Sequence, residues 1–423
     1  MTVDLTLRKC KVLYKKRFLD VGIAIDEGKI VLITKETRLP KSDEKINCKG
    51  NIVLPGLVDT HVHFREPGLE WKEDWSTGSK AAAKGGITLV MDMPNTEPTT
   101  TTIVRLLEKK KLAKKSVVNF GLYAGITGDN TDQIKDLSKH ADAFKLYMAK
   151  TTGVFKLNDN VLIMKAFDEI SKTDKVACVH AENQKMNERF LKIYKNKDDP
   201  LAYAKSRPRE SEILAINDVI GMAEQTKVKL HVCHVTTKGG LDLIRKAKNV
   251  DVTCETCPQY LFMTQEDLKK KKSLAKMNPP LRTKEDQVAL WKGIFNGTID
   301  ILASDHAPHT LEEKYQDIWL APAGVPGVET TLLLMLNAVN KKRIGLKKVI
   351  ELMHDNPVKR FGLGKYGNVE AGNYANLTVI DLKKKWKITR EGLLTKCGWS
   401  PYEGWKGKGM PVMTIVNGNV VFE

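Results

Sequence analysis

The stretch NIVLPGLVDTHVHFREPG, residues 51–68, is an apolar run that ends in imidazole and charged side chains. The run is typical of a buried strand, in which residues i and i+2 point to the same face. His61 and His63 therefore project together, and Arg65 continues that face. Because (β/α)8 barrels carry their chemistry at the carboxyl ends of their strands, this stretch predicts a barrel strand with a functional site at its end.

Seven more short apolar runs follow, separated by amphipathic stretches such as TTIVRLLEKKKLAKK. The runs are GITLVMDMP, SVVNFGLYAGI, DAFKLYMA, KVACVHAE, VKLHVCHVT, VDVTCETCPQYL and IDILASDHAP. Strand–helix units repeated in this way predict an α/β protein with a (β/α)8 TIM-type barrel over residues 54–366. A doubly wound open sheet is the alternative, but the sequence lacks the glycine-rich phosphate turn that such sheets usually carry.

The two ends of the chain have a different pattern. Residues 1–53 and 367–423 contain short alternating strands with Gly or Asn turns and little helical periodicity. Neither segment is long enough for a comfortable core of its own. We therefore expect both ends to pair into one small composite β-sandwich beside the barrel.

Composition narrows the class of protein. The 69 Lys and Arg residues exceed the 51 Asp and Glu residues, giving a net charge of +18, but the lysines form short runs along the whole chain without interleaved aromatic residues. This distribution favours solvated faces over a nucleic-acid interface. No apolar stretch reaches the roughly 18 residues of a membrane span, and the start lacks a secretory pattern. With seven scattered cysteines, the expected protein is cytoplasmic, has reduced thiols and does not bind membranes.

Histidines gather at the ends of the predicted strands. Seven of the nine do so; the exceptions are His140 and His354. Buried separately, these side chains would be costly, whereas converging on cations they become ligands. His231 and His234 are three residues apart and face opposite ways on a regular strand, so only one can be a ligand, and the spacing leaves open which. The single pair Cys254 and Cys257 indicates strand residues and not a zinc site.

Eight motifs occur in order along nearly the whole chain. They are DTHVHFREPG, MDMPNT, FKLYMA, VHAEN, HVCHVT, MNPPLRT, ASDHAPHT and ANLTVIDL. Together they make the chain resemble the dihydroorotases of the cyclic amidohydrolase superfamily. The resemblance implies a (β/α)8 barrel with a composite β-sandwich and two zinc ions per chain. It also implies the ligands: His61 and His63 for the first zinc, completed by Asp305 as catalytic acid and base, and His180 and His234 for the second.

Lys145, in FKLYMA, matches the lysine that bridges the two metals in many relatives after carboxylation by CO2; others use an aspartate in a different setting. An unmodified ammonium could not lie between two cations, so the resemblance implies an N6-carboxylated Lys145. The alternative is a strand lysine that reaches solvent.

Arg65 predicts the character of the substrate. A guanidinium beside a metal pair is repelled unless an anion lies between them, and its planar fork matches a carboxylate. Asn95 in MPNT and His309 in HAPH could bind the same carboxylate. The resemblance adds contacts from His63, from Asn278 (or, alternatively, a loop-capping role for it) and from the backbone of Ala323 and Gly324. Allantoinases and hydantoinases typically lack Arg65, Asn95 and His309 at these positions.

The expected activity is therefore the reversible cyclisation of N-carbamoyl-L-aspartate to L-dihydroorotate in pyrimidine biosynthesis. The attacking group would be a hydroxide held between the zinc ions, with Asp305 moving the proton. One alternative is another cyclic-amide hydrolase, allantoinase-like or hydantoinase-like. Another is a non-catalytic scaffold, although no ligand position is missing here. Association with aspartate transcarbamoylase or with a second copy is left open, and so is whether residues 310–327 form a lid.

Overall fold

The computed structural model describes residues 2–14, 17–151, 156–195, 197–364 and 366–423. Eight parallel strands form one sheet, in which each strand pairs with its neighbours in chain order. They are β6 (Leu57–Val62), β7 (Ile87–Asp92), β8 (Asn119–Gly125), β9 (Ala143–Tyr147), β10 (Val176–His180), β11 (Lys229–Val232), β12 (Val252–Thr256) and β13 (Ile301–Leu302). Each of these strands lies within one of the eight apolar runs of the sequence.

The first and last strands of this sheet, β6 and β13, are joined by contacts just beyond the end of β13, which close the sheet into a barrel. Val62 of β6 forms a parallel bridge with His306, which follows β13. The backbone nitrogen of His63 donates to the carbonyl of His306 at 2.8 Å, and the nitrogen of His306 donates to the carbonyl of His61 at 3.3 Å. This closure confirms the predicted (β/α)8 barrel and joins the two strand ends that carry the His-x-His and Asp-His motifs.

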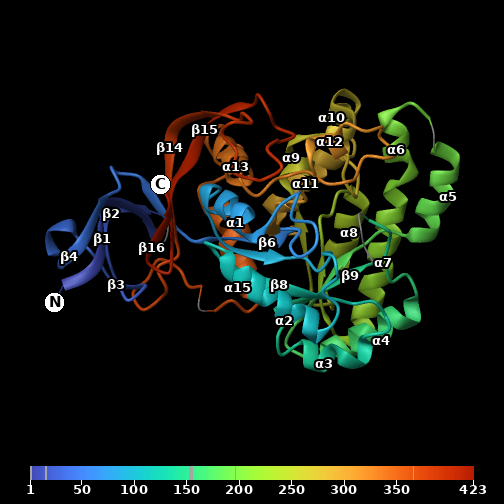
Figure 1. The fold of residues 1–423 in the computed structure, drawn as a ribbon, viewed down its shortest axis with the longest axis horizontal. Coiled ribbons are helices and arrows are strands. Elements are labelled where there is room, and N and C mark those ends of the chain that lie inside the picture. Colours follow the sequence, from blue (N-terminus) through green and yellow to red (C-terminus); the bar gives the residue numbers. More distant parts are fainter. Residues whose placement is uncertain (1, 15–16, 152–155, 196, 365) are drawn as a thin grey trace.

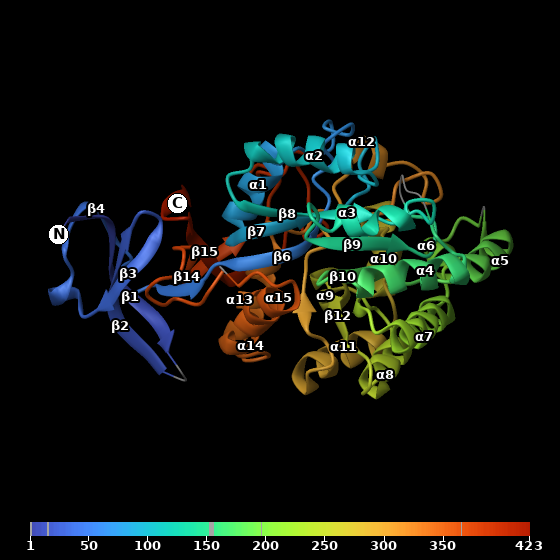
Figure 2. The same ribbon diagram turned by 90° about the horizontal axis from the view of Figure 1, so that it is seen from below.

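Helices connect the strands and surround the barrel (Figure 2). The main ones are α1 (Trp75–Lys84), α2 (Ile103–Leu112), α3 (Ile134–Leu137), α4 (Asn160–Ser171), α7 (Arg209–Thr226), α8 (Lys238–Lys246), α11 (Lys284–Asn296), α13 (Thr331–Asn340), α14 (Leu346–Ile350) and α15 (Asn356–Arg360). Five others, α5 (Gln184–Tyr194), α6 (Pro200–Ser206), α9 (Pro258–Phe262), α10 (Gln265–Lys271) and α12 (Leu311–Lys314), follow the carboxyl ends of β10, β12 and β13.

The ends of these helices follow from local sequence. The side chain of Asp74 accepts a hydrogen bond from the nitrogen of Thr77 at 2.8 Å and starts α1. The hydroxyl of Thr283 does the same for the nitrogen of Asp286 at 3.3 Å and starts α11. Gly297, with φ of 78°, ends α11 in the left-handed region that favours glycine. Such caps fix where each strand–helix unit turns.

The two ends of the chain form a second eight-stranded sheet, seen beside the barrel in both views (Figures 1 and 2). Its strands are β1 (Thr2–Tyr14), β2 (Arg17–Asp26), β3 (Lys29–Thr34), β4 (Lys41–Asn47), β5 (Ile52–Pro55), β14 (Leu377–Lys387), β15 (Lys406–Val416) and β16 (Asn419–Phe422). Antiparallel pairing of β14 with β5 joins the two ends. The sheet has its own apolar core. The predicted pairing of both chain ends beside the barrel is therefore confirmed, with the strands of the expected composite β-sandwich joined in one sheet.

Two sequence predictions need correction. The run NIVLPGLVDTHVHF was taken as one strand, but Gly56 divides it into β5 of the composite sheet and β6 of the barrel. A Cβ on Gly56 would lie 2.2 Å from Oγ1 of Thr88, which explains the glycine at this crossing. The run VDVTCETCPQYL was also taken as one strand, but β12 ends at Thr256 and Pro258 starts α9. Cys254 is therefore in a strand, whereas Cys257 caps a helix.

Other expectations concern the cysteines and the membrane. All seven cysteines are free and buried, as expected for reduced thiols. In the described parts of the chain, no helix combines the length and apolarity needed to cross a bilayer.

Candidate metal centre

The carboxyl ends of the barrel strands surround a narrow cavity of about 30 Å³. Most of the predicted site residues line it. They are His61, His63, Arg65, Asn95, His180, His234, Asn278, Asp305, Ala323 and Gly324, together with Tyr147, Thr151 and Ala307. The remaining two predicted residues, Lys145 and His309, lie just outside this lining. Lys145 contacts Cys233, the residue before His234, and His309 contacts Arg65.

His61 and His63 face the same carboxylate. Nε2 of His61 lies 3.4 Å and Nε2 of His63 lies 3.2 Å from Oδ1 of Asp305. Their outer nitrogens are engaged elsewhere: Nδ1 of His61 lies 2.5 Å from Oε1 of Glu255, and Nδ1 of His63 lies 2.5 Å from Oδ1 of Asn95. When Nδ1 carries the proton of each imidazole, the Nε2 lone pairs point into the cavity, which is the arrangement that metal-binding histidines need.

Charges around this pair favour a cation. Burial and the neighbouring Lys145 lower the pKa of His61, but the carboxylates of Glu255 and Asp305 outweigh them and raise it to about 10. Burial opposes ionisation of Asp305 as well, but His61 and the hydrogen bond from His63 hold its pKa below the ordinary value. The space between these carboxylates therefore stabilises positive charge, whether on an imidazolium or on a metal ion.

His180 and His234 form the other half of the cluster. Nδ1 of His180 lies 3.0 Å from Nε2 of His234, and Nε2 of His180 lies 2.7 Å from Oε2 of Glu182. Burial lowers the pKa of both imidazoles, so both are neutral. With Glu182 holding the Nε2 proton of His180, two lone-pair-bearing nitrogens can converge on one point. His61, His234 and Asp305 also each offer a ligand atom within 4.8 Å of one another, so the donor set fits metal binding.

Lys145 lies inside the barrel below this cluster. Its side chain is fully buried, and its Nζ lies 3.0 Å from Sγ of Cys233. The alternative of a strand lysine that reaches solvent is therefore wrong. Of the two histidines whose spacing left the ligand open, His234 joins the cluster, whereas Nε2 of His231 lies 3.2 Å from Oε2 of Glu255.

Several of these residues adopt backbone conformations that non-glycine residues rarely use. Arg65, His234 and Asp305 have φ of 65°, 35° and 46°. Each lies where the chain leaves a barrel strand. Left-handed backbone costs on the order of 1 kcal/mol or more at such residues and clusters at functional sites. The strain sets the directions in which these three side chains enter the cavity.

A buried ion pair holds the backbone between His63 and Arg65. The carboxylate of Asp92, at the end of β7, accepts from the backbone nitrogen of Phe64 at 2.6 Å. The same carboxylate pairs with Lys109 of α2, and both side chains are fully buried. Because breaking a buried pair is costly, this contact fixes the His-x-His-x-Arg stretch relative to the barrel.

Arg65 is buried and, in the described part of the chain, has no Asp or Glu oxygen within ion-pair distance. Its Nε donates to the carbonyl of Pro308 at 3.1 Å, and its Nη2 lies 3.3 Å from Nε2 of His309. Nδ1 of His309 accepts a hydrogen bond from the ammonium of Lys72 at 3.1 Å, so its Nε2 carries the proton and donates to the carbonyl of Ala323 at 3.2 Å. Burial, Arg65 and Lys72 lower the pKa of His309, which is neutral. The guanidinium is thus left with an unmatched positive charge.

The backbone of Ala323 and Gly324 is held from behind by Lys314. The buried ammonium donates to the carbonyls of Lys276 at 3.1 Å, Pro322 at 2.9 Å and Gly324 at 2.9 Å. Gly324 has φ of 143°, and a Cβ there would lie 2.6 Å from the carbonyl oxygen of Ala307. Side chains larger than glycine would therefore displace this wall of the cavity.

A segment of the C-terminal part of the chain also reaches this wall. Trp399, between β14 and β15, is buried, and its Nε1 donates to the carbonyl of His309 at 2.7 Å. The ammonium of Lys314 lies 5.7 Å from the centre of its ring. Strands of the composite sheet thus carry a segment that braces the barrel mouth.

Asn278 accepts a hydrogen bond on Oδ1 from the hydroxyl of Tyr203, which comes from the distant helix α6. This contact differs from the local loop-capping role that was the alternative for it. Asn95 likewise uses Oδ1 for His63, so only its Nδ2 can donate to a bound ligand.

Sequence reasoning missed the carboxylates behind the histidines. Glu255 lies in β12 between the two cysteines, and Glu182 follows His180 by two residues. Both are fully buried, as is Lys314. A glutamate inside an apolar strand run is rarely buried without a partner, so Glu255 gave a usable signal. Lys314 lies in an ordinary charged run and gave none.

Comparisons with known proteins agree with this geometry. The model of the Amidohydrolase family matches residues 52–421. The dihydroorotase of Methanosarcina acetivorans is 38% identical over 99% of this chain and 92% of its own length. That of Pyrococcus furiosus is 39% identical over 98% and 91%. Among solved structures, an L-hydantoinase (dihydropyrimidinase) from Arthrobacter aurescens superposes with a TM-score of 0.95 at 34% identity, covering 100% of this chain and 96% of that one. A barrel with this cluster at its mouth, matched along its length by such relatives, belongs to the amidohydrolase family, among its cyclic amidohydrolases.

Proposed function

We propose that this chain is a dihydroorotase, which interconverts N-carbamoyl-L-aspartate and L-dihydroorotate. The observation that carries the proposal is the buried Arg65, which lies beside the histidine–aspartate cluster without a carboxylate partner in the described part of the chain. A buried guanidinium is costly unless an anion pairs with it. The substrate carboxylate of a dihydroorotase supplies that anion, and the relatives named above as dihydroorotases support the same activity.

We further propose two zinc ions per chain. His61, His63 and Asp305 would hold one, His180 and His234 the other, and an N6-carboxylated Lys145 would bridge them. Imidazole and carboxylate donors suit zinc. When bound, such a metal pair lowers the pKa of water and polarises a carbonyl oxygen.

In this proposal Asp305 moves the proton. During ring opening it accepts a proton from the attacking water as the new C–O bond forms at the ring carbonyl. It then delivers that proton to the ring nitrogen as the C–N bond breaks. Its lowered pKa keeps it ionised and ready to accept. Ring closure is the reverse.

The remaining residues would orient the substrate. Arg65 would bind the carboxylate through its fork, while Nδ2 of Asn95 and the imidazole of His309 would bind it alongside. Asn278, His63 and the backbone of Ala323 and Gly324 would contact the ring amides. Lys314 would hold this backbone in place, because it donates to the carbonyls of Pro322 and Gly324 on either side of Ala323.

The test compares two rings that differ only in the carboxylate: L-dihydroorotate and 5,6-dihydrouracil, at equal zinc content. We expect strong preference for dihydroorotate. In Arg65→Met we expect kcat/KM for dihydroorotate to fall by about 10- to 150-fold, because roughly 1.5–3 kcal/mol is lost with a charge-assisted contact. Activity on dihydrouracil should change little. Equal activity of the native enzyme on both rings would overturn the proposal.

A hydantoinase is the second candidate, favoured by the close superposition on the Arthrobacter aurescens enzyme. It predicts faster opening of a 5-substituted hydantoin than of dihydroorotate in the same assay. An allantoinase-like activity is tested there with allantoin, and a non-catalytic scaffold would open none of these rings. The proposed partner is thus a small molecule. Association with aspartate transcarbamoylase or with a second copy remains a prediction, which light scattering and mixing experiments would check.

A further inference from the structure

The two halves of the candidate metal centre differ in what lies behind their histidines. Nδ1 of His61 meets Glu255 at 2.5 Å. The other neighbours of that carboxylate are Nε2 of His231 at 3.2 Å and the hydroxyl of Thr60 at 3.3 Å. No Lys or Arg nitrogen of the described chain lies within ion-pair distance of Glu255. In the described chain, the carboxylate behind His61 is therefore contacted by two imidazoles and a hydroxyl, and by no Lys or Arg.

Behind His180 the carboxylate is neutralised. Nε2 of His180 meets Oε2 of Glu182 at 2.7 Å. Arg207 donates to both oxygens of Glu182, from Nε at 3.0 Å and from Nη2. Glu182 is fully buried and the side chain of Arg207 is 12% exposed, so water screens this pair little. The guanidinium therefore draws the charge of Glu182 away from the imidazole.

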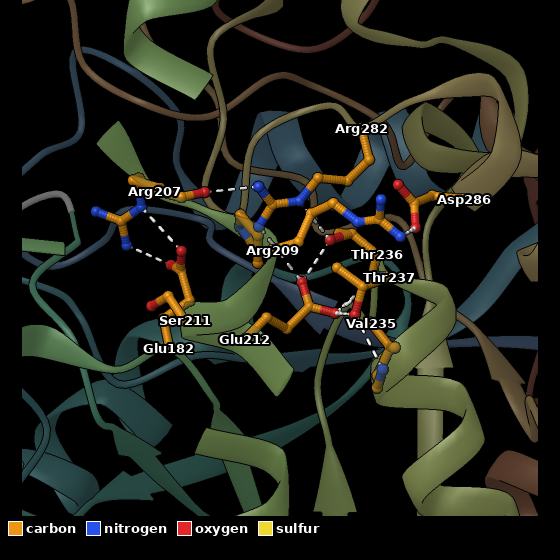
Figure 3. A network of polar contacts seen from close by, with 12 residues as sticks. Glu182, Arg207, Arg209, Ser211, Glu212, Val235, Thr236, Thr237, Arg282 and Asp286 are labelled. Atoms are coloured by element: carbon orange, nitrogen blue, oxygen red, sulfur yellow. Dashed lines mark hydrogen bonds and ion pairs between the residues drawn. The ribbon is translucent and has the colours of Figure 1, made fainter. Parts of the chain in front are cut away.

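Figure 3 shows Arg207 linked on one side to Glu182 and on the other to Arg282. Its Nη1 donates to the carbonyl of Lys150 at 3.2 Å, and its own carbonyl accepts from Nη1 of Arg282 at 2.6 Å. Nε of Arg282 in turn donates to the hydroxyl of Thr236 at 3.1 Å. Thr236 lies two residues after His234 and is anchored by Glu212, whose carboxylate accepts from its backbone nitrogen at 2.9 Å. The same network thus supports both His180 and His234.

We infer that Arg207 sets the metal affinity of the His180–His234 position by neutralising Glu182, and that this position binds its metal less tightly than the His61–His63 position. A carboxylate that accepts the outer N–H of a metal-binding imidazole makes that imidazole a better donor. Glu255 does this for His61 without a Lys or Arg partner in the described chain, whereas Glu182 shares its charge with Arg207. Arg207 is a positioning and tuning residue that acts through Glu182. This inference rests on the proposed metal pair.

The experiment measures zinc per chain during titration with a competing chelator, on the full-length zinc-loaded protein. In the native protein we expect two separate steps of metal loss. Arg207→Met should strengthen the weaker site by about tenfold, so that the two steps approach each other. Glu182→Gln should weaken the same site by about 10–100-fold, the range typical of lost outer partners. Cobalt substitution, with its ligand-field spectrum, follows the same sites independently of catalysis.

The network provides a matched control. Arg209 is labelled in Figure 3, and its Nη2 lies 2.9 Å from Oδ1 of Asp286, so changing it also removes a guanidinium from a buried carboxylate, but not from Glu182. Arg209→Met should leave both steps unchanged. Arg207→Lys, which keeps the charge, should leave the weaker site within a few-fold of native.

The test rests on the two variants changing metal affinity in opposite directions: Arg207→Met should raise it and Glu182→Gln should lower it. If Arg207→Met weakens the site as Glu182→Gln does, Arg207 only holds the structure and the inference is overturned. A single step of two equivalent metals in the native protein would also overturn it. If the native protein binds no zinc at all, the proposed function itself fails.

Discussion

In the composite sheet the buried core consists of aliphatic side chains, one methionine and two thiols. At the mouth of the barrel the buried groups are instead imidazoles, carboxylates, lysines and guanidinium groups, such as His61, Glu255, Lys314 and Arg65. The first region is stabilised by removing apolar surface from water. In the second region, buried polar and charged side chains are tolerated because each has a specific partner in the protein or, in our proposal, in the bound substrate or metal. A substitution should therefore affect stability in the sheet and chemistry at the mouth.

The largest effect should come from Lys145→Ala. If the carboxylated side chain bridges the metals, its removal should abolish measurable activity and lower the zinc content of the purified protein. Short carboxylic acids such as acetate, which can occupy the vacated space as anions, should restore part of both. Zinc analysis and the dihydroorotate assay, with and without added acid, are the measurements. A fully active Lys145→Ala enzyme would contradict the proposed bridge. It would also mean that a buried polar group at the barrel mouth can be removed without an effect on the chemistry.

Leu7→Ala tests the other side of the comparison. Leu7 lies in β1 and is fully buried in the core of the composite sheet. A buried Leu-to-Ala change costs about 2–5 kcal/mol of unfolding free energy. Urea unfolding should show this loss, while kcat and KM at 25 °C should stay near native values. A tenfold change in kcat would mean that the sheet core reaches the chemistry.

Lys276 should give a pH-dependent stability difference. It is 6% exposed, and burial, followed by repulsion from Arg207, lowers its pKa from 10.5 to about 8. The unfolded chain then binds more protons between pH 8 and 10.5, so stability rises with pH across this window. Below pH 8 the cost of the buried ammonium is fully present, on the order of 3 kcal/mol.

Unfolding free energies of native protein and Lys276→Met, measured from pH 7 to 10.5, check this expectation. The unfolding free energy of the native protein should rise relative to that of Lys276→Met as the pH rises. Parallel curves for the two proteins would show that Lys276 keeps an ordinary pKa.

The smallest effect should come from Lys314→Met. The apolar side chain would leave the carbonyls of Pro322 and Gly324 without their donor and loosen the wall they form. We expect KM for dihydroorotate to rise by about tenfold, which corresponds to 1.4 kcal/mol, with kcat nearly unchanged. Steady-state kinetics provide the measurement. An equal fall in kcat with unchanged KM would place Lys314 in the chemical step instead.

The parts of this molecule that could be predicted from sequence are those with a local pattern. Strand runs with polar ends predicted all eight barrel strands and drew attention to His61, His63 and Asp305. A local pattern does not show with which sheet a strand pairs. The apolar run therefore could not show that Gly56 separates a strand of the composite sheet from a strand of the barrel. Spacing could not choose between His231 and His234 either, because the choice depends on where Glu255 lies.

The support of the site was not predictable for a related reason. The contact of His61 with Glu255 spans 194 residues, and that of Glu182 with Arg207 spans 25. Nothing in either neighbourhood indicates the partner. Such pairs exist only because strands distant in sequence end at the same mouth, so they follow from the closed barrel and not from any motif.

The bond from Trp399 to the carbonyl of His309 has a consequence for synthesis of the protein. All predicted metal ligands have been translated once the barrel is complete. Trp399, which contacts His309, is translated later, in the segment between β14 and β15. Nascent chains should therefore reach full activity only after the segment between β14 and β15 has been translated, and proteolytic cleavage within that segment should lower the activity of the folded protein.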